Sequence, residues 1–152
     1  MRTAKNIIDK KNRIQNTVPP QTLVIDALKM MIEVNLSYLV VMDGNRYKGI
    51  FSERDYSRNV ILKGRSSTTT TVGEVMATDL PSVLPAQTAE HCMNILSNTK
   101  TRYLVNFDAD GNFKGVVTIH DIIRIVLADK RDVFGRAVAN YLNNDDDEGK
   151  VI

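Results

Sequence analysis

Two stretches of the sequence decide the fold: Gly49-Ile50-Phe51-Ser52-Glu53-Arg54-Asp55 and, 66 residues later, Gly115-Val116-Val117-Thr118-Ile119-His120-Asp121. In each stretch an apolar run follows a glycine and ends at a hydroxyl residue, and an aspartate stands three residues after that hydroxyl. The pattern predicts a buried strand that leads directly into a helix, because Ser/Thr-x-x-Asp is a form of the helix capping box. Its occurrence twice indicates an internal repeat.

The similarity extends upstream of both stretches. Apolar residues at i, i+3, i+4 and i+7, the pattern of one buried helix face, recur 65 residues apart. The two sets are Val24, Ala27, Leu28 and Met31, and Ala89, Cys92, Met93 and Leu96. A proline precedes each set, and strand-like runs follow at 38–40 and 103–105. Each repeat is therefore predicted to fold as strand, helix, strand, hairpin, strand and helix.

The predicted fold class is α/β in the broad α+β sense, with two repeats packed sheet to sheet as a pseudo-twofold pair and flanked by N- and C-terminal helices. A single repeat is too small to bury both faces of its sheet, so pairing is expected. Such pairing also predicts clefts that suit a small ligand. The expected segments are an N-terminal helix (1–16), the first repeat (17–65), a connector with a short helix opened by Thr71 (66–77), the second repeat (78–128), and a C-terminal helix with an acidic tail (129–152).

The composition is that of an ordinary soluble globular protein: 152 residues, 43% hydrophobic and 25% charged. The longest apolar run, Tyr38 to Met42, is far shorter than the roughly 20 residues of a membrane-spanning helix. The single cysteine, Cys92, excludes an intrachain disulfide and a cysteine-clustered metal site. Residues 1–65 carry 12 Lys and Arg against 6 Asp and Glu, but no basic cluster contains interleaved aromatics. We expect a cytoplasmic protein with no membrane or nucleic-acid partner.

The two motifs have a chemical and a structural interpretation. Free backbone N–H groups at a helix start favour a phosphate, and the hydroxyl of Ser52 or Thr118 adds a further polar group there. The carboxylate of Asp55 or Asp121 suits the two hydroxyls of a ribose. Alternatively, the same residues cap the helix and bind nothing. Both interpretations are open at this point.

The quoted stretches are similar to the signature of the cystathionine-β-synthase (CBS) domain, and residues 17–128 resemble a tandem CBS pair, or Bateman module, of the stand-alone type. The resemblance implies a regulatory module, not an enzyme, that binds AMP, ADP, ATP, S-adenosylmethionine or NAD(H) in a cleft between the repeats. It also implies a homodimer that acts as an energy sensor for an unidentified partner protein.

The resemblance implies roles for particular residues as well. Asp55 and Asp121 would hold ribose hydroxyls, and Ser52 and Thr118 would lie near phosphate. Further phosphate contacts are expected from Arg54, Arg102 and His120. Adenine contacts are expected near Val18 and Val83. The resemblance leaves open which adenosyl ligand binds and whether a chain holds one or two.

Two other function classes compete with this interpretation. The first is a constitutive homodimeric scaffold that binds a protein partner and no nucleotide. The second is an enzyme, which is disfavoured because P-loop, dinucleotide-binding and nucleophile-elbow motifs are missing from the sequence.

The remaining conspicuous residues are interpreted as structural. Residues 108–112 resemble the opening of a calcium loop, but their glycine stands at position four, so a hairpin turn is expected. His91 and His120 have no cysteine partner for zinc. Cys92 and Met93 are expected to be buried in the core. No catalytic and no metal-binding residue is predicted.

Overall fold

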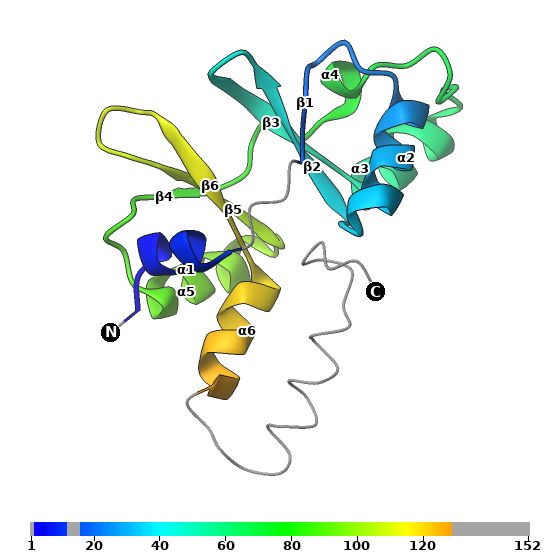
Figure 1. Ribbon diagram of the computed structural model, residues 1–152. Helices are drawn as coiled ribbons and strands as arrows, with labels where there is room; N and C mark the ends of the chain where they lie inside the picture. Colours follow the sequence, from blue (N-terminus) through cyan, green and yellow to red (C-terminus); the bar gives the residue numbers. More distant parts are fainter. Residues whose placement is uncertain (1, 12–15, 129–152) are drawn as a thin grey trace. The chain divides into compact units, whose positions relative to one another are not determined.

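The computed structural model describes residues 2–11 and 16–128 of the chain, which form two compact units (Figure 1). We call residues 16–79 the first unit, and residues 2–11 together with 80–128 the second unit. The predicted C-terminal helix and acidic tail (129–152) lie outside the described residues. In the part of the chain that is described, no helix is both long enough and apolar enough to span a bilayer.

The first unit contains a three-stranded sheet in the order β1-β2-β3. Strand β1 (Thr17–Val18) pairs parallel with β2 (Tyr38–Asp43), which pairs antiparallel with β3 (Arg46–Ser52). Helix α2 (Val24–Val34) connects β1 to β2. After β3 the chain forms α3 (Glu53–Asp55), a π-helical turn η1 (Tyr56–Val60) and a 3-10 turn η2 (Ile61–Lys63), and it later forms α4 (Val72–Val75).

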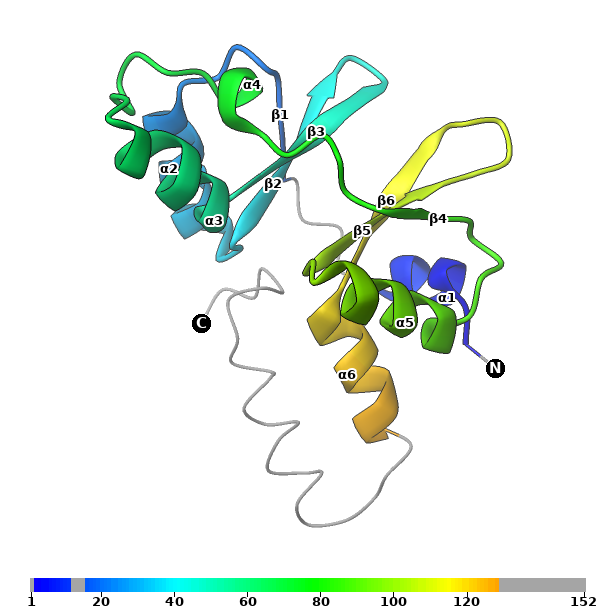
Figure 2. The ribbon, with the colours of Figure 1, turned by 180° about the vertical axis from the view of Figure 1, so that it is seen from behind.

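The second unit repeats this arrangement with a sheet in the order β4-β5-β6. Strand β4 (Ser82–Val83) pairs parallel with β5 (Tyr103–Phe107), and β5 pairs antiparallel with β6 (Phe113–Thr118). Helix α5 (Ala89–Thr99) connects β4 to β5, and α6 (Ile119–Ala128) follows β6. The unit also includes α1 (Ala4–Lys10), which packs on β6 (Figure 2).

Each unit has its own apolar core between one face of its sheet and its helices, as the repeated periodicity predicts. The core of the first unit contains Val18, Val24, Ala27, Met31, Leu39, Val41, Phe51, Val60, Val72 and Val75. The core of the second contains Ala4, Ile7, Val83, Cys92, Leu96, Leu104, Val117 and Ile122. The α+β fold class and the predicted order of elements in each repeat are therefore confirmed.

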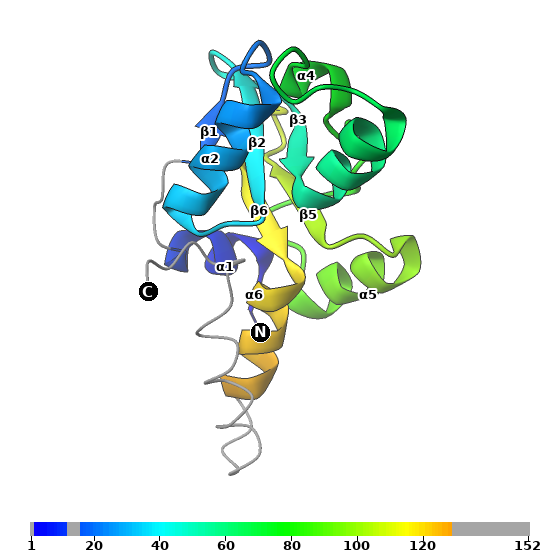
Figure 3. The ribbon, with the colours of Figure 1, turned by 90° about the vertical axis from the view of Figure 1, so that its right-hand side faces the viewer.

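Helices α1 and α4 dock on their units through equivalent backbone contacts. Thr3 forms a β-bridge with Thr88, as Thr71 does with Leu23. Beyond these bridges, four N–H groups donate to carbonyls at matching distances: Ala4 to Gln87 and Val72 to Thr22 at 2.8 Å, and Lys5 to Pro85 and Gly73 to Pro20 at 2.9 Å. The partners are 65 residues apart in the repeats, and the two helices are 68 apart. Figure 3 shows α4 beside β3 and α1 beside β6.

A glycine in each sheet permits this close docking. A Cβ on Gly49 would lie 2.6 Å from the carbonyl oxygen of Ala77, and a Cβ on Gly115 would lie 3.1 Å from Ile8. Gly115 also has a φ of +151°, a value that side chains with a Cβ rarely adopt. The glycine before each motif therefore makes room for the helix that crosses the strand.

Two local predictions have opposite outcomes. The prediction that Met93 is buried is wrong: its side chain is 38% exposed, and Ile95 packs on the core from the same helix. The predicted hairpin turn after β5 is confirmed, since Asp108 Oδ1 accepts hydrogen bonds of 2.9 Å from the N–H groups of Asp110 and Asn112. The described residues include no group of three or more His, Cys, Asp or Glu side chains arranged to hold a metal.

Candidate functional site

The first motif stands where β3 ends and α3 begins. The Ser52 hydroxyl accepts a 3.3 Å hydrogen bond from the Asp55 N–H, while the Ser52 N–H and Oγ each lie 2.9 Å from Asp55 Oδ2. Ser52 has extended backbone angles and caps α3, so both halves of the capping box are formed. The predicted capping box is therefore present, and it holds a carboxylate at a strand end.

The surroundings of Asp55 oppose its ionisation. Burial raises the pKa of Asp55 above its ordinary value, although the hydrogen bonds from Ser52 and the positive charges of Arg58 and Arg54 lower it. Both arginines are exposed, and Asp55 is half-buried. A partly desolvated carboxylate of this kind gains from a ligand that donates hydrogen bonds to it.

The second motif is more deeply buried. Thr118 ends β6 with 1% exposure, and its N–H donates a 2.8 Å hydrogen bond to Asp121 Oδ2. The Asp121 N–H donates back to Thr118 Oγ1 at 3.2 Å. Asp121 is 7% exposed and forms an ion pair of 2.9 Å with Lys11. The two motifs thus share their capping geometry and differ in what surrounds the carboxylate.

Sequence reasoning missed Lys11. The residue lies outside both repeats, and 110 positions separate it from Asp121. Its backbone N–H caps α1 by donating to Ile8 O at 3.2 Å. The available signal was a lysine within the predicted N-terminal helix, and that signal does not identify Asp121 as its partner.

The predicted phosphate contacts lie in unlike surroundings. The Arg102 carbonyl accepts a 3.1 Å hydrogen bond from the first residue of α6, so Arg102 adjoins the second motif with an exposed side chain. Ser37 holds the equivalent place beside the first motif, where its carbonyl accepts from Glu53 N–H at 3.0 Å. Arg54 is exposed, whereas His120, at the same place in the second repeat, is 8% exposed.

The predicted adenine contacts, Val18 and Val83, have side chains in the two apolar cores. Val18 pairs with Val41 of β2, while Ser52 pairs with Tyr38 of the same strand. Val18 and Ser52 therefore flank β2 at positions three residues apart.

Both motifs lie in stretches of the chain that match a known protein family. The family model named CBS domain matches residues 4–61 and 72–128. The mitochondrial CBS domain-containing protein CBSX3 of Arabidopsis thaliana is 33% identical over 118 residues, a match that covers 74% of this chain and 57% of that protein. An uncharacterized 17.7 kDa protein of Acidianus ambivalens is 32% identical over 122 residues, which is 78% of this chain and 71% of that protein.

The fold is also similar to that of solved structures with CBS domains. A protein with CBS domains from Burkholderia ambifaria superposes with a TM-score of 0.79 at 35% identity, over 86% of this chain and 98% of that one. The structure of CBSX2 in complex with AMP superposes with a TM-score of 0.70 at 29% identity, over 86% of this chain and 100% of that one. One relative of this fold and sequence thus binds an adenine nucleotide.

Proposed function

The chain belongs to the CBS domain family, as a tandem pair, and from this premise we propose that it is a non-enzymatic regulatory module that binds an adenosyl ligand. The candidates are AMP, ADP, ATP, S-adenosylmethionine and NAD(H). The observation that carries the proposal is the half-buried carboxylate of Asp55, fixed by Ser52 at a strand-to-helix junction beside two exposed arginines. The AMP complex of CBSX2 supports the ligand class.

The chemistry of the first motif suits a nucleoside phosphate. A ribose offers two neighbouring hydroxyl donors, and a carboxylate is an acceptor with room for both. Charged hydrogen bonds of this kind contribute about 1.5–3 kcal/mol each. Arg54 and Arg58 carry positive charge close enough to Asp55 to influence its pKa, and a ligand phosphate near them would be stabilised.

Regulation requires that the ligand bind two states of the protein with different affinities. We propose that binding biases the arrangement of the CBS pair, or of a homodimer built from it, and that a regulated partner protein responds to the change. We propose the cytoplasm as the compartment. Two Arabidopsis relatives carry other compartments in their names: CBSX3 is called mitochondrial and CBSX2 chloroplastic.

A thermal-shift panel of AMP, ADP, ATP, NAD, NADH and S-adenosylmethionine tests the proposal. A ligand at 100 times its Kd stabilises the folded protein by about 2.7 kcal/mol, which raises Tm by several degrees for a chain of this size. We expect Asp55→Asn to abolish the shift and Asp43→Asn, which alters an exposed aspartate on β2 in the same unit, to preserve it. No shift with any of the six compounds would favour a constitutive scaffold.

A further inference from the structure

The ends of α1 and α4 diverge although the two helices dock in the same way. At the end of α4, the backbone of Ala77 pairs with Ile50 through two hydrogen bonds of 2.8 and 3.0 Å. The residue equivalent to Ile50 in the second unit is Val116, and its carbonyl accepts a 3.0 Å hydrogen bond from Lys11 Nζ. A lysine side chain thus replaces a backbone N–H at this point of the sheet.

The same ammonium group reaches the second motif. Lys11 Nζ lies 2.9 Å from Asp121 Oδ2, the oxygen that also accepts the Thr118 N–H. The side chains of Asp121 and Lys11 are 5% and 27% exposed. A carboxylate buried to this extent requires a compensating partner, and the chain supplies one from its own N-terminal segment.

The first motif has different neighbours. The helix offset of 68 residues places Asp79, an exposed acidic residue, at the position equivalent to Lys11. Asp55 Oδ2 accepts its hydrogen bonds from Ser52, a residue of the motif itself. Among residues 2–11 and 16–128, the hydrogen bonds to the Asp55 carboxylate come from its own motif, so this carboxylate remains suited to donors brought by a ligand.

We infer that Lys11 is a built-in competitor for ribose at the second motif: its ammonium occupies the carboxylate of Asp121, so an adenosyl ligand binds at Asp55 and gains the second motif only when the Lys11–Asp121 ion pair opens. The inference rests on the proposed function and adds to it a stoichiometry of one ligand per chain. It also couples the second motif to the end of α1, because a ligand there must displace Lys11 from both Asp121 and the Val116 carbonyl.

Titration calorimetry with AMP tests the inference on full-length proteins. We expect wild type to bind one AMP per chain, and Asp55→Asn to weaken that binding at least tenfold. In Asp55→Asn/Lys11→Met, binding should return with at least tenfold higher affinity than in Asp55→Asn, and adding Asp121→Asn should abolish it. In the wild-type background, Lys11→Met should raise the stoichiometry to two.

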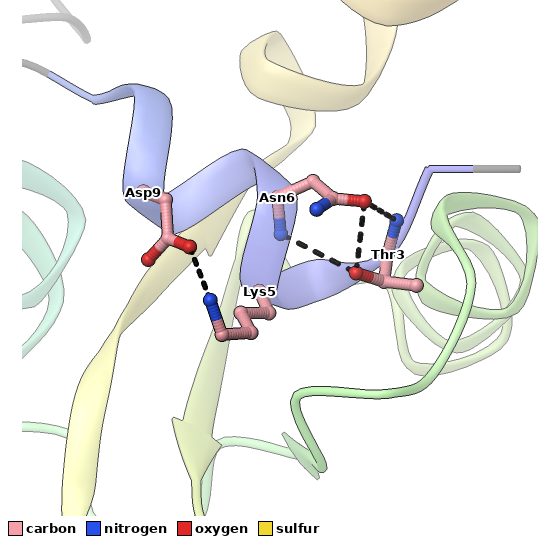
Figure 4. A network of polar contacts seen from close by, with 4 residues as sticks. All are labelled: Thr3, Lys5, Asn6 and Asp9. Atoms are coloured by element: carbon pink, nitrogen blue, oxygen red, sulfur yellow. Dashed lines mark hydrogen bonds and ion pairs between the residues drawn. The ribbon is translucent and has the colours of Figure 1, made fainter.

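The controls separate the loss of charge from a loss of folding. Lys5 of α1 forms a solvent-exposed ion pair with Asp9 (Figure 4). Lys5→Met removes this pair and should leave AMP binding unchanged. Lys11→Arg keeps the cation and should behave as wild type. Lys11→Gln keeps a donor for the Val116 carbonyl without the charge, and it should open the second motif even if Lys11→Met unfolds. The Tm of each variant without ligand establishes that it is folded.

The outcomes distinguish the inference from the function on which it rests. Three results would overturn the role of Lys11 and leave ligand binding intact. Wild type could bind two AMP molecules per chain, or its AMP site could be lost in Asp121→Asn and retained in Asp55→Asn. The third result is folded Lys11→Met and Lys11→Gln proteins that bind no additional AMP. Binding by the Lys11 variants but not by wild type would support the role of Lys11 and contradict binding at the first motif. No AMP binding by any variant would overturn both.

Discussion

Asp55 and Asp121 stand at the same place in two copies of one motif, yet their electrostatic surroundings differ. Asp55 is partly desolvated beside exposed arginines, and its pKa is raised. Asp121 is almost fully buried and is neutralised by Lys11 at 2.9 Å. At the scale of single residues the repeat is therefore asymmetric, and each carboxylate carries its own prediction.

The raised pKa of Asp55 predicts a pH dependence of stability. The folded protein takes up the Asp55 proton at a higher pH than the unfolded chain, so ionised Asp55 reduces the free energy of unfolding. As pH falls through the raised value towards the ordinary one, wild type should gain stability relative to Asp55→Asn. The measurement is the Tm difference between the two proteins from neutral to acidic pH. A difference that moves against wild type on acidification would contradict the desolvation of Asp55.

The Lys11–Asp121 ion pair predicts a large stability effect. Lys11→Met leaves the buried charge of Asp121 uncompensated, and since Lys11 is partly exposed we expect a loss of about 2 kcal/mol, below the range for fully buried pairs. Urea denaturation measures it. Lys11→Met/Asp121→Asn should recover part of the loss, because no buried charge remains.

The exposed Lys5–Asp9 ion pair is the reference for the effect of Lys11→Met. Lys5 and Asp9 lie 2.6 Å apart on α1 with side chains 66% and 57% exposed. Lys5→Met should change the free energy of unfolding by less than about 1 kcal/mol, as is usual for surface pairs. Equal losses from Lys5→Met and Lys11→Met would remove any special role of burial at Asp121.

At the scale of elements, β2 and β5 have the same pairing and register irregularity but differ at one core position. Val41 of β2 lies in the first core, whereas the equivalent residue of β5, 65 positions later, is Asn106. Asn106 is fully buried, and among the described residues neither atom of its amide group has a hydrogen-bond partner. Desolvating such a group without compensation costs stability.

We therefore predict that Asn106→Val stabilises the second unit by about 1–2 kcal/mol, since the substitution removes a buried unsatisfied amide of similar size. Chemical denaturation is the measurement. The reverse change in the first unit, Val41→Asn, should be destabilising. A loss of stability in Asn106→Val would contradict the cost assigned to the buried amide.

The elements were predictable from the sequence to the extent that their signals are local. The periodicity of α2 and α5, the turn at Asp108 and the strand-to-helix junctions at Ser52 and Thr118 were all expected, and the structure confirms them. The helix expected after β3 is present but is broken into α3, η1 and η2. The burial of Met93 was predicted wrongly because the apolar residues of α5 fit two neighbouring helix faces, and it is Ile95 that packs against the core.

The candidate site was predicted only in part, for a physical reason. Ser52, Asp55, Thr118 and Asp121 share a short motif whose hydrogen bonds run within three residues. The Lys11 contact joins residues 110 positions apart. Helices α1 and α4 follow an offset of 68 residues, so a search for similarity at 65 or 66 residues does not align them. Long-range pairing of a single charge leaves no periodic trace in a sequence.

At the scale of the whole molecule, the second unit is not one contiguous stretch of chain, because α1 completes a core that otherwise comes from residues 80–128. Ile7→Asp, which places a charge in that core, should therefore increase amide hydrogen exchange across residues 80–128 more than across residues 17–79. Lys10→Gln, on the exposed side of α1, should leave both patterns unchanged. Equal effects of Ile7→Asp on both units would contradict the assignment of α1 to the second unit.

The equivalent docking of α1 and α4 has a consequence for how such a chain could arise by duplication. The duplicated stretch is a short helix followed by one sheet repeat, but each short helix packs on the other copy's repeat. A peptide containing one copy alone would lack the helix that closes its own core. Two such peptides would satisfy each other by exchanging helices, a domain-swapped dimer. Covalent fusion of the two peptides would produce the connectivity seen here, in which each short helix still packs on the other copy's repeat.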